Sequence, residues 1–247
     1  PSKPENLEAV KQAIAEHALD LGLAFDGDGD RVGIIDDQRN IIWADRQMML
    51  YAADVLERKP GATIIFDIKS STHLADFIEA HGGVPLMWKT GHSFIKAKMK
   101  ETGAELAGEM SGHIFFKERW LGFDDGLYSA ARMLEILSKH NQPTSAVFDE
   151  LPDSINTPEL QILFAEGEHY KFMERFKQEA DFGDADILAI DGLRVNFADG
   201  WGLIRPSNTT PCLVLRCEAD SEARLRAIQD KFKQEILTQD SSLDVPF

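Results

Sequence analysis

Residues 25–31, with the sequence FDGDGDR, constrain the fold more than any other stretch of this chain. Asp26, Asp28 and Asp30 alternate with glycines, and a short apolar run stands on each side. The second run, 32–35, is rich in β-branched residues, so the pattern predicts a strand, a loop and a second strand. Side chains two residues apart in a straight strand lie about 7 Å from each other. The loop must therefore curl before the carboxylates can meet, and glycine, which lacks Cβ, permits this.

Three converging carboxylates need a counter-charge, and their hard oxygen atoms suit Mg²⁺ or Ca²⁺ rather than zinc. An EF-hand is excluded, because its sixth position must be glycine and here is Arg31, and because the flanking runs predict strands rather than helices. Two alternatives stay open from this loop alone. One is a plain turn built from Asp-Gly pairs, and the other is a metal-dependent phosphatase with an aspartate nucleophile.

The charge of the loop indicates what else it binds. Three carboxylates and one dication leave a net charge of roughly −1, and a metal of this kind often has a phosphate oxygen as a further ligand. A phosphate here would need a nearby cation, and Arg31 is placed to provide it.

The whole chain has 247 residues and a formal net charge of −16, which argues against nucleic acid or an anionic membrane as a partner. Hydrophobic residues make up 43% of it, enough for a core without disulfides, and no apolar run approaches the ~20 residues of a membrane span. Cys212 and Cys217 lie five residues apart in a predicted strand, hence on opposite faces, so we expect no bridge between them and a reducing, cytoplasmic setting. Because the chain starts at Pro1 without methionine, we expect a piece of a longer protein.

Strand and helix patterns alternate through the middle of the chain. Buried-type strands are predicted at 62–67, 84–89 and 104–107, with helical patterns between them. This order predicts an α/β fold with a largely parallel sheet.

Polar side chains follow these three strands. They are Lys69 after the first, His92 after the second, and Glu109, Ser111 and His113 after the third. Each residue alone is most simply read as a solvated loop residue, but ligands of such sheets bind beyond the carboxyl ends of the strands. The convergence of all three ends predicts a ligand site there.

The pattern changes after the proline-containing stretch 151–158, which we take as a linker. The remaining segments predict a small α+β domain with an antiparallel sheet. Residues 205–211, RPSNTTP, connect its last two strands and offer one guanidinium, three hydroxyls and consecutive backbone N–H groups. Arginine matches phosphate oxygens in pairs, and N–H groups in a turn favour anions, so we interpret this loop as a phosphate site rather than an ordinary polar turn.

Two further expectations concern helices. We expect Asp45 to cap a helix that begins at Arg46. For the helix predicted at 127–140, we expect one apolar stripe to face the core. Its members are Leu127, Ala130, Ala131, Leu134 and Leu137.

Three motifs together resemble the α-D-phosphohexomutase family, most closely its bacterial phosphomannomutase/phosphoglucomutase members. They are FDGDGDR at 25–31, GEMSGH at 108–113 and RPSNTTP at 205–211. The resemblance implies the end of a second domain at 1–43, a mixed, mostly parallel three-layer α/β third domain at 44–152, and a small fourth domain at 153–247. The family's phosphoserine loop belongs to its first domain and has no counterpart here, which implies that N-terminal domains of the same protein are missing.

The resemblance also implies an isomerase that interconverts hexose 1-phosphate and hexose 6-phosphate, of mannose, glucose or both. Mg²⁺ and a hexose 1,6-bisphosphate activator would serve as cofactors. The implied metal ligands are Asp26, Asp28 and Asp30, and the implied catalytic residues are Arg31, Lys69 and His113. The implied substrate-binding residues are His92, Glu109, Ser111, Arg205, Ser207, Asn208, Thr209 and Thr210.

Without the phosphoserine loop, we expect this chain to be inactive as a mutase on its own. Two alternative functions stay open: a fragment that binds a phosphosugar without converting it, and a metal-dependent sugar phosphatase. A phosphatase would release phosphate without any bisphosphate, whereas a mutase would form the isomer and depend on bisphosphate.

Overall fold

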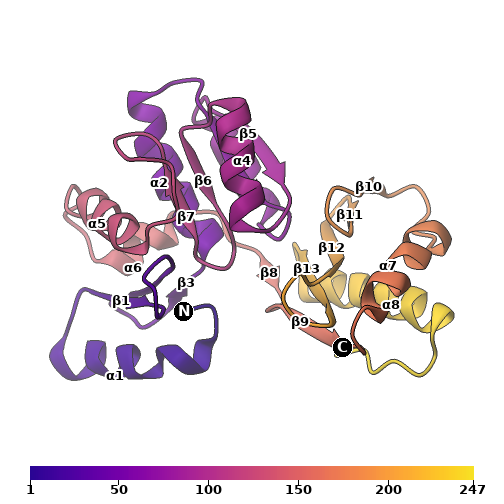
Figure 1. The fold of residues 1–247 in the computed structure, drawn as a ribbon. Coiled ribbons are helices and arrows are strands. Elements are labelled where there is room, and N and C mark those ends of the chain that lie inside the picture. Colours follow the sequence, from indigo (N-terminus) through magenta and orange to yellow (C-terminus); the bar gives the residue numbers. More distant parts are fainter. The chain divides into compact units, whose positions relative to one another are not determined.

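The computed structural model describes all residues, 1–247, and divides into two compact units, Pro1–Asp153 and Ser154–Phe247. Each unit has its own sheets, helices and apolar core (Figure 1). None of the helices combines the length and apolar character that a membrane crossing requires.

The first unit opens with a small layer of helix on sheet. A 3₁₀ turn (Pro4–Leu7) leads into α1 (Glu8–His17), which packs on the antiparallel strands β1 (Leu21–Phe25), β2 (Val32–Asp36) and β3 (Ile41–Ile42). Strands β1 and β2 pair from Leu21–Asp36 to Phe25–Val32, so residues 26–31 form the loop of a hairpin. The predicted strand, loop and strand are confirmed.

The main body of the first unit is a four-stranded sheet in the order β5-β4-β6-β7. Its strands are β4 (Thr63–Asp67), β5 (Val84–Trp88), β6 (Leu106–Gly108) and β7 (Ile114–Phe116). Strand β4 is parallel to both of its neighbours, and only β7 runs antiparallel. The helices are α2 (Ala44–Arg58), α3 (Thr72–Ala80), α4 (His92–Thr102), α5 (Gly126–Leu137) and α6 (Thr144–Asp149).

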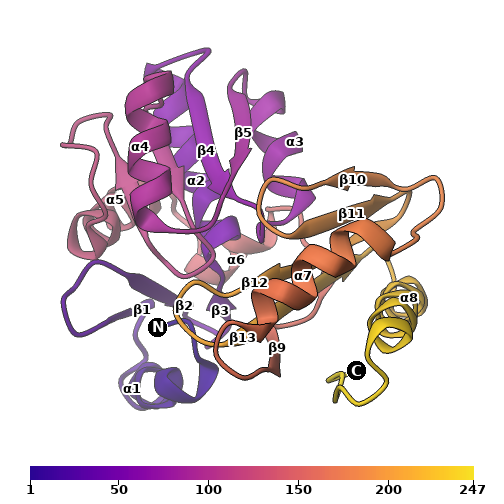
Figure 2. The ribbon, with the colours of Figure 1, turned by 45° about the vertical axis from the view of Figure 1, so that its right-hand side comes forward.

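These helices cover both faces of the sheet. Side chains alternate along β4, so Ile64 and Phe66 pack into the core shared with α2, α3 and α5, while Ile65 packs against α4. The mixed, mostly parallel three-layer architecture is therefore confirmed (Figure 2).

The second unit is a six-stranded antiparallel sheet with two helices. Its elements are β8 (Ile155–Asn156), β9 (Leu160–Leu163), α7 (Glu168–Glu179), β10 (Asp186–Leu188), β11 (Leu193–Phe197), β12 (Gly200–Pro206), β13 (Cys212–Ala219) and α8 (Glu222–Gln239). Strands β10 to β13 are neighbours in chain order, and β13 also pairs with β8 and β9. Helices α7 and α8 contribute Phe172, Phe176 and Phe232 to one core. The small α+β domain with an antiparallel sheet is confirmed, and both cysteines are buried and unbridged.

Both helix expectations need correction. Helix α2 begins at Ala44 with Trp43 at its N-cap, so Asp45 lies in the first turn, where its Oδ2 accepts a hydrogen bond from the backbone N–H of Ser71 at 3.1 Å. Asp45 thus supports the start of α3, while its Oδ1 accepts the backbone N–H of Arg46 at 3.0 Å within the first turn of α2.

On α5 the predicted stripe is wrong at Leu127, Ala131 and Leu134, which are exposed. The buried side includes Met133 and Arg132. The buried face of α5 differs from the predicted one because apolar residues occur around its whole circumference, so they do not fix which face is buried. The orientation is set by Arg132, whose charged partners lie on one side only.

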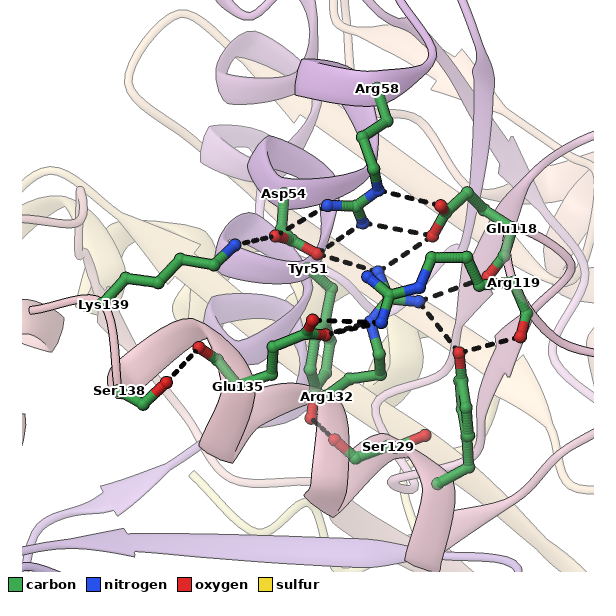
Figure 3. A network of polar contacts seen from close by, with 11 residues as sticks. Tyr51, Asp54, Arg58, Glu118, Arg119, Ser129, Arg132, Glu135, Ser138 and Lys139 are labelled. Carbon is green, nitrogen blue, oxygen red and sulfur yellow. Dashed lines mark hydrogen bonds and ion pairs between the residues drawn. The ribbon is translucent and has the colours of Figure 1, made fainter.

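Those partners form the ion-pair network of Figure 3, which joins α2, α5 and the loop after β7. Arg132 Nη2 lies 2.8 Å from Asp54 Oδ2 and 2.9 Å from Glu118 Oε2. Arg58 bridges the same two carboxylates, at 2.7 Å and 2.9 Å. The network fixes the start of the loop that leads from β7 to α5.

Candidate functional site

The aspartate loop, residues 25–31, lies against residues 108–113, although strands β2 to β6 come between the two segments in the sequence. Arg31 and His113 form an antiparallel bridge, and the Val32 N–H donates to the Gly112 carbonyl at 3.2 Å. Gly112 has a φ of +97°, and a Cβ there would lie 3.0 Å from the Val32 carbonyl oxygen. Two of the three motifs are thus parts of one site.

The carboxylates of Asp26, Asp28 and Asp30 converge as expected: one oxygen from each lies within 4.8 Å of the others. Gly29, with a φ of +76°, makes the turn that brings them together. Oδ1 of Asp30 is buried and has no hydrogen-bond partner. Three oxygen ligands with one unsatisfied buried oxygen fit a hard divalent cation.

The charges of this cluster are unevenly balanced. Asp26 accepts the backbone N–H of Arg31 at 3.2 Å and also pairs with its guanidinium. Burial alone would raise the pKa of Asp26, but these bonds from Arg31 outweigh it and lower the pKa to about 2. Burial raises the pKa of Asp30, His113 opposes this, and the neighbouring Asp26 and Asp28 raise it further. Arg31 therefore neutralises one end of the cluster, and the other end retains mutual repulsion.

His113 connects the aspartate cluster to the 108–113 loop. Its Nε2 lies 3.3 Å from Asp30 Oδ2, and its Nδ1 lies 2.8 Å from Ser111 Oγ and 3.4 Å from Glu109 Oε2. Burial lowers its pKa, although Asp30 and Asp124 act in the opposite direction. An imidazole that lies between two carboxylates is arranged to accept or pass on a proton.

Glu109 follows β6 and is buried, with only 2% of its surface exposed. It accepts a hydrogen bond from the backbone N–H of Gly91, which follows β5. Burial, and then the negative charge of Asp67, raise its pKa to about 7, and Lys69 partly offsets them. Lys69 Nζ lies 3.6 Å from Asp67 Oδ2. The ends of β4, β5 and β6 are therefore in contact, as the sequence predicts.

His92 lies beside His113, with ring centroids 5.8 Å apart, and its side chain is half exposed. Asp124, which belongs to none of the three sequence motifs, lies next to both. Its carboxylate is 3.5 Å from His92 Nδ1 and 2.9 Å from Lys96 Nζ, and it groups with Asp30 and His113. The signal in the sequence was the Asp124–Asp125 pair, because one helix needs only one cap and Asp125 provides it.

The second unit carries the RPSNTTP loop. The guanidinium of Arg205 is almost fully buried at the end of β12, and its Nε donates to Asp191 at 3.0 Å. Ser207 Oγ accepts the backbone N–H groups of Thr209 and Thr210, each at 3.3 Å, so the loop closes on its own hydroxyl. Asn208, Thr209 and Thr210 are exposed.

Helix α7 anchors this loop through two residues that the sequence analysis missed. His169 Nε2 lies 3.3 Å from the Ser207 carbonyl oxygen, and Tyr170 Oη donates to the same oxygen at 3.2 Å. Neither residue belongs to a motif, so only the fold reveals this contact.

The candidate residues thus form two sets, each within its own unit. The first set is Asp26, Asp28, Asp30, Arg31, Lys69, His92, Glu109, Ser111 and His113. The second set is Arg205, Ser207, Asn208, Thr209 and Thr210. The chain is therefore part of a multidomain α/β protein. One of its units carries a carboxylate cluster suited to a cation, and the other carries a buried arginine with loop hydroxyls suited to an anion.

The particular family follows from sequence comparison. Residues 1–39, 43–155 and 159–235 match, in order, α/β/α domain II, α/β/α domain III and the C-terminal domain of phosphoglucomutase/phosphomannomutase. The chain belongs to the phosphoglucomutase/phosphomannomutase family.

Individual relatives are similar over the same extent. The chain is 55% identical to a phosphomannomutase/phosphoglucomutase of Pseudomonas putida, covering 100% of this chain and 53% of the relative. It is 57% identical over 235 residues to a phosphoglucomutase of Neisseria gonorrhoeae, covering 94% of this chain and 51% of the relative.

A crystal structure of a phosphoglucomutase/phosphomannomutase family protein from Burkholderia thailandensis has the same fold, with a TM-score of 0.93 and 50% identity, over 100% of this chain and 53% of that one. The chain therefore spans about half the length of the relatives it matches.

Proposed function

We propose that this chain supplies the C-terminal half of a phosphohexomutase, which interconverts hexose 1-phosphate and hexose 6-phosphate of mannose, glucose or both. The observation that carries the proposal is the joining of the aspartate cluster to the 108–113 loop, with His113 only 3.3 Å from Asp30. A cation site and a site with sugar-binding groups at this separation suit the transfer of a phosphoryl group to a sugar hydroxyl.

Asp26, Asp28 and Asp30 would hold Mg²⁺, which when bound supplies electrostatic stabilisation for the transferring phosphoryl group. The residues around this site then balance charge. Arg31 would exchange its contact with Asp26 for phosphate oxygens, and Lys69, at the end of β4, adds a second cation.

Glu109, Ser111 and His113 would bind the sugar and handle its proton. A carboxylate with a pKa of about 7 and a neighbouring hydroxyl provide both an acceptor and a donor for adjacent sugar hydroxyls. His113 would take the proton of the attacking hydroxyl and pass it towards Asp30 or Glu109. His92 would contact the substrate beside it.

The RPSNTTP loop would bind the phosphate that is not reacting, through Arg205 and the hydroxyl and amide groups of residues 207–210. The phosphoserine that donates and accepts the phosphoryl group would come from N-terminal domains outside this chain. A hexose 1,6-bisphosphate would be both the intermediate and the activator. On this proposal the chain alone binds phosphosugar but does not convert it.

The test is a calorimetric titration of the chain with glucose 1-phosphate, beside Arg205→Ala and Arg224→Ala. We expect binding that Arg205→Ala abolishes. The matched control is Arg224, which lies at the start of α8 and whose guanidinium pairs with Asp199. Its replacement should leave binding unchanged.

An activity assay with and without hexose 1,6-bisphosphate completes this test. Formation of glucose 6-phosphate by the chain alone would contradict the proposed dependence on missing domains. Release of inorganic phosphate without bisphosphate would instead support a sugar phosphatase.

A further inference from the structure

The turn between β10 and β11 packs directly against the backbone of Arg205. This turn comprises residues 189–192 and ends with Asp191 and Gly192, and Gly192 has a φ of +81°. A Cβ atom on Gly192 would lie 2.3 Å from the Ile204 carbonyl oxygen and 2.6 Å from Arg205 Cα. Only glycine allows so close an approach, and the approach places the Asp191 side chain beside the guanidinium.

Asp191 engages the guanidinium at one position. Its Oδ2 accepts the Arg205 Nε–H at 3.0 Å, and the side chains of the two residues are 13% and 5% exposed. Nη2 of Arg205 is buried and has no hydrogen-bond partner. The protein thus fixes the guanidinium at Nε and leaves a donor at its outer end for a ligand.

This arrangement lets an arginine meet an anion without a search through rotamers. Ordering a long side chain on binding lowers affinity, and a guanidinium already held in place has lost that freedom beforehand. A guanidinium bound through Nε can still offer its two terminal nitrogens to two oxygens of one phosphate.

We propose that Asp191 is a positioning residue for phosphosugar binding, which holds Arg205 so that its terminal N–H groups face the phosphate. The inference rests on the proposed role of the RPSNTTP loop. It makes an unusual prediction about sign. If only the charge of Asp191 mattered, its removal next to an anion site would strengthen phosphate binding, whereas loss of positioning weakens it.

The experiment is calorimetric titration of the chain with glucose 1-phosphate after Asp191→Asn and Asp191→Ala. We expect binding about tenfold weaker in both, which corresponds to about 1.4 kcal/mol. Asp191→Glu, which keeps a carboxylate within reach, should recover part of the affinity.

The chain contains a matched control in the next hairpin turn of the same sheet, Asp199-Gly200. Asp199 also accepts from an arginine, Arg224 Nη2 at 2.8 Å, but that arginine is remote from the loop. Asp199→Ala should therefore leave affinity unchanged. Circular dichroism and thermal unfolding of every variant establish that the second unit remains folded.

Two readouts separate positioning from general support of the fold. In an Arg205→Lys background, which keeps the charge but not the fork, Asp191→Asn should weaken binding no further. The ¹H–¹⁵N resonance of Arg205 Nε should be protected from exchange in the parent chain and lose protection in Asp191→Asn.

Tighter binding by Asp191→Asn, or an equal loss in the Arg205→Lys background, would overturn the inference and leave the proposed function intact. Full affinity in Arg205→Ala would show instead that the loop is not the phosphate site, which overturns the proposed function. Absence of binding by the parent chain would overturn both.

Discussion

The carboxylate of Glu109 is buried in the first unit and has a raised pKa. It has no full counter-charge: its firm contacts are the Gly91 N–H and the edge of His113, and Asp67 adds a negative charge nearby. The protonated form is therefore favoured in the folded protein, where the pKa rises from 4.5 to about 7.

A stability prediction follows from this shift. Because the folded pKa is raised, the contribution of Glu109 to stability is full below pH 4.5 and is lost as the pH rises through about 7. We expect Glu109→Gln, which cannot ionise, to gain free energy of unfolding relative to the parent across this window, by about 2–3 kcal/mol. Urea unfolding at pH 5 and pH 8 measures the gain.

Glu57→Gln, at an exposed position of α2, is the control and should show no such pH-dependent gain. A difference between Glu109→Gln and the parent that is the same at both pH values would contradict the assigned shift.

At this scale, sequence predicts residues whose chemistry is marked by a motif and misses those that act through the fold. The aspartates of residues 26–31 are recognisable because three carboxylates in five residues repel one another unless a cation holds them together. Asp124, His169 and Asp191 are each an ordinary loop or helix residue in sequence. Their contacts with His92, Ser207 and Arg205 arise from segments that meet only after folding.

Among the elements, α5 is held to the sheet by charge as much as by apolar contact (Figure 3). Arg132 is 2% exposed, pairs with Asp54 and Glu118, and lies with its guanidinium carbon 4.3 Å from the centre of the Phe116 ring. Burial raises the pKa of both carboxylates, but hydrogen bonds and charges from the surrounding cations outweigh it and lower the pKa.

We expect Arg132→Met to destabilise the first unit by about 3 kcal/mol, because it leaves buried carboxylates short of counter-charge. Arg119→Met is the control, since Arg119 pairs with Glu135 at the exposed edge of the same network and its loss should cost less than about 1 kcal/mol. Chemical unfolding compares them. Equal losses would show that burial of the network has no energetic consequence.

The same helix shows what an apolar pattern leaves undetermined. The strands predicted at 62–67, 84–89 and 104–107 follow from short apolar runs and are found as β4, β5 and β6. Strand β8 (Ile155–Asn156), however, lies within the stretch 151–158 that we take as a linker from its sequence, and the pattern misses it because it is only two residues long and pairs with the distant β13. The orientation of α5 does not follow from its apolar pattern, because leucines on its outer side are spaced as regularly as the buried Met133 and Ile136. The residue that decides the orientation is the buried Arg132. Buried charge is the case for which hydrophobic periodicity gives the wrong face.

No buried apolar cluster is shared between the two compact units: three clusters lie within Pro1–Asp153 and one lies within Ser154–Phe247. Every strand of the six-stranded sheet lies within Ser154–Phe247, so the second unit needs no strand from the first unit. We therefore expect residues 154–247 to fold when produced alone.

Thermal unfolding followed by circular dichroism tests this prediction, with residues 200–247 as the control. The control retains β12, β13 and α8 but lacks the strands on either side and should not fold. A lack of any cooperative transition in 154–247 would contradict the prediction.

At the scale of the chain, fold class and family were both predictable, because three motifs fall in a fixed order among alternating strands and helices. The expected domain limits at 43/44 and 152/153 stay predictions. How loops belonging to different family domains combine was less accessible, since backbone pairing between residues 31–32 and 112–113 leaves no mark in composition or periodicity.

That pairing has a consequence for anyone who recombines members of this family. The backbone N–H of Val32 donates a hydrogen bond to Gly112, and Arg31 pairs with His113. We therefore expect the conformation of each loop to depend on the other. In a chimera that takes residues 108–113 from one parent and residues 25–31 from another, the two loops come from proteins in which they did not pack against each other. Both loops should therefore be taken from the same parent, with no crossover point between residues 25 and 113.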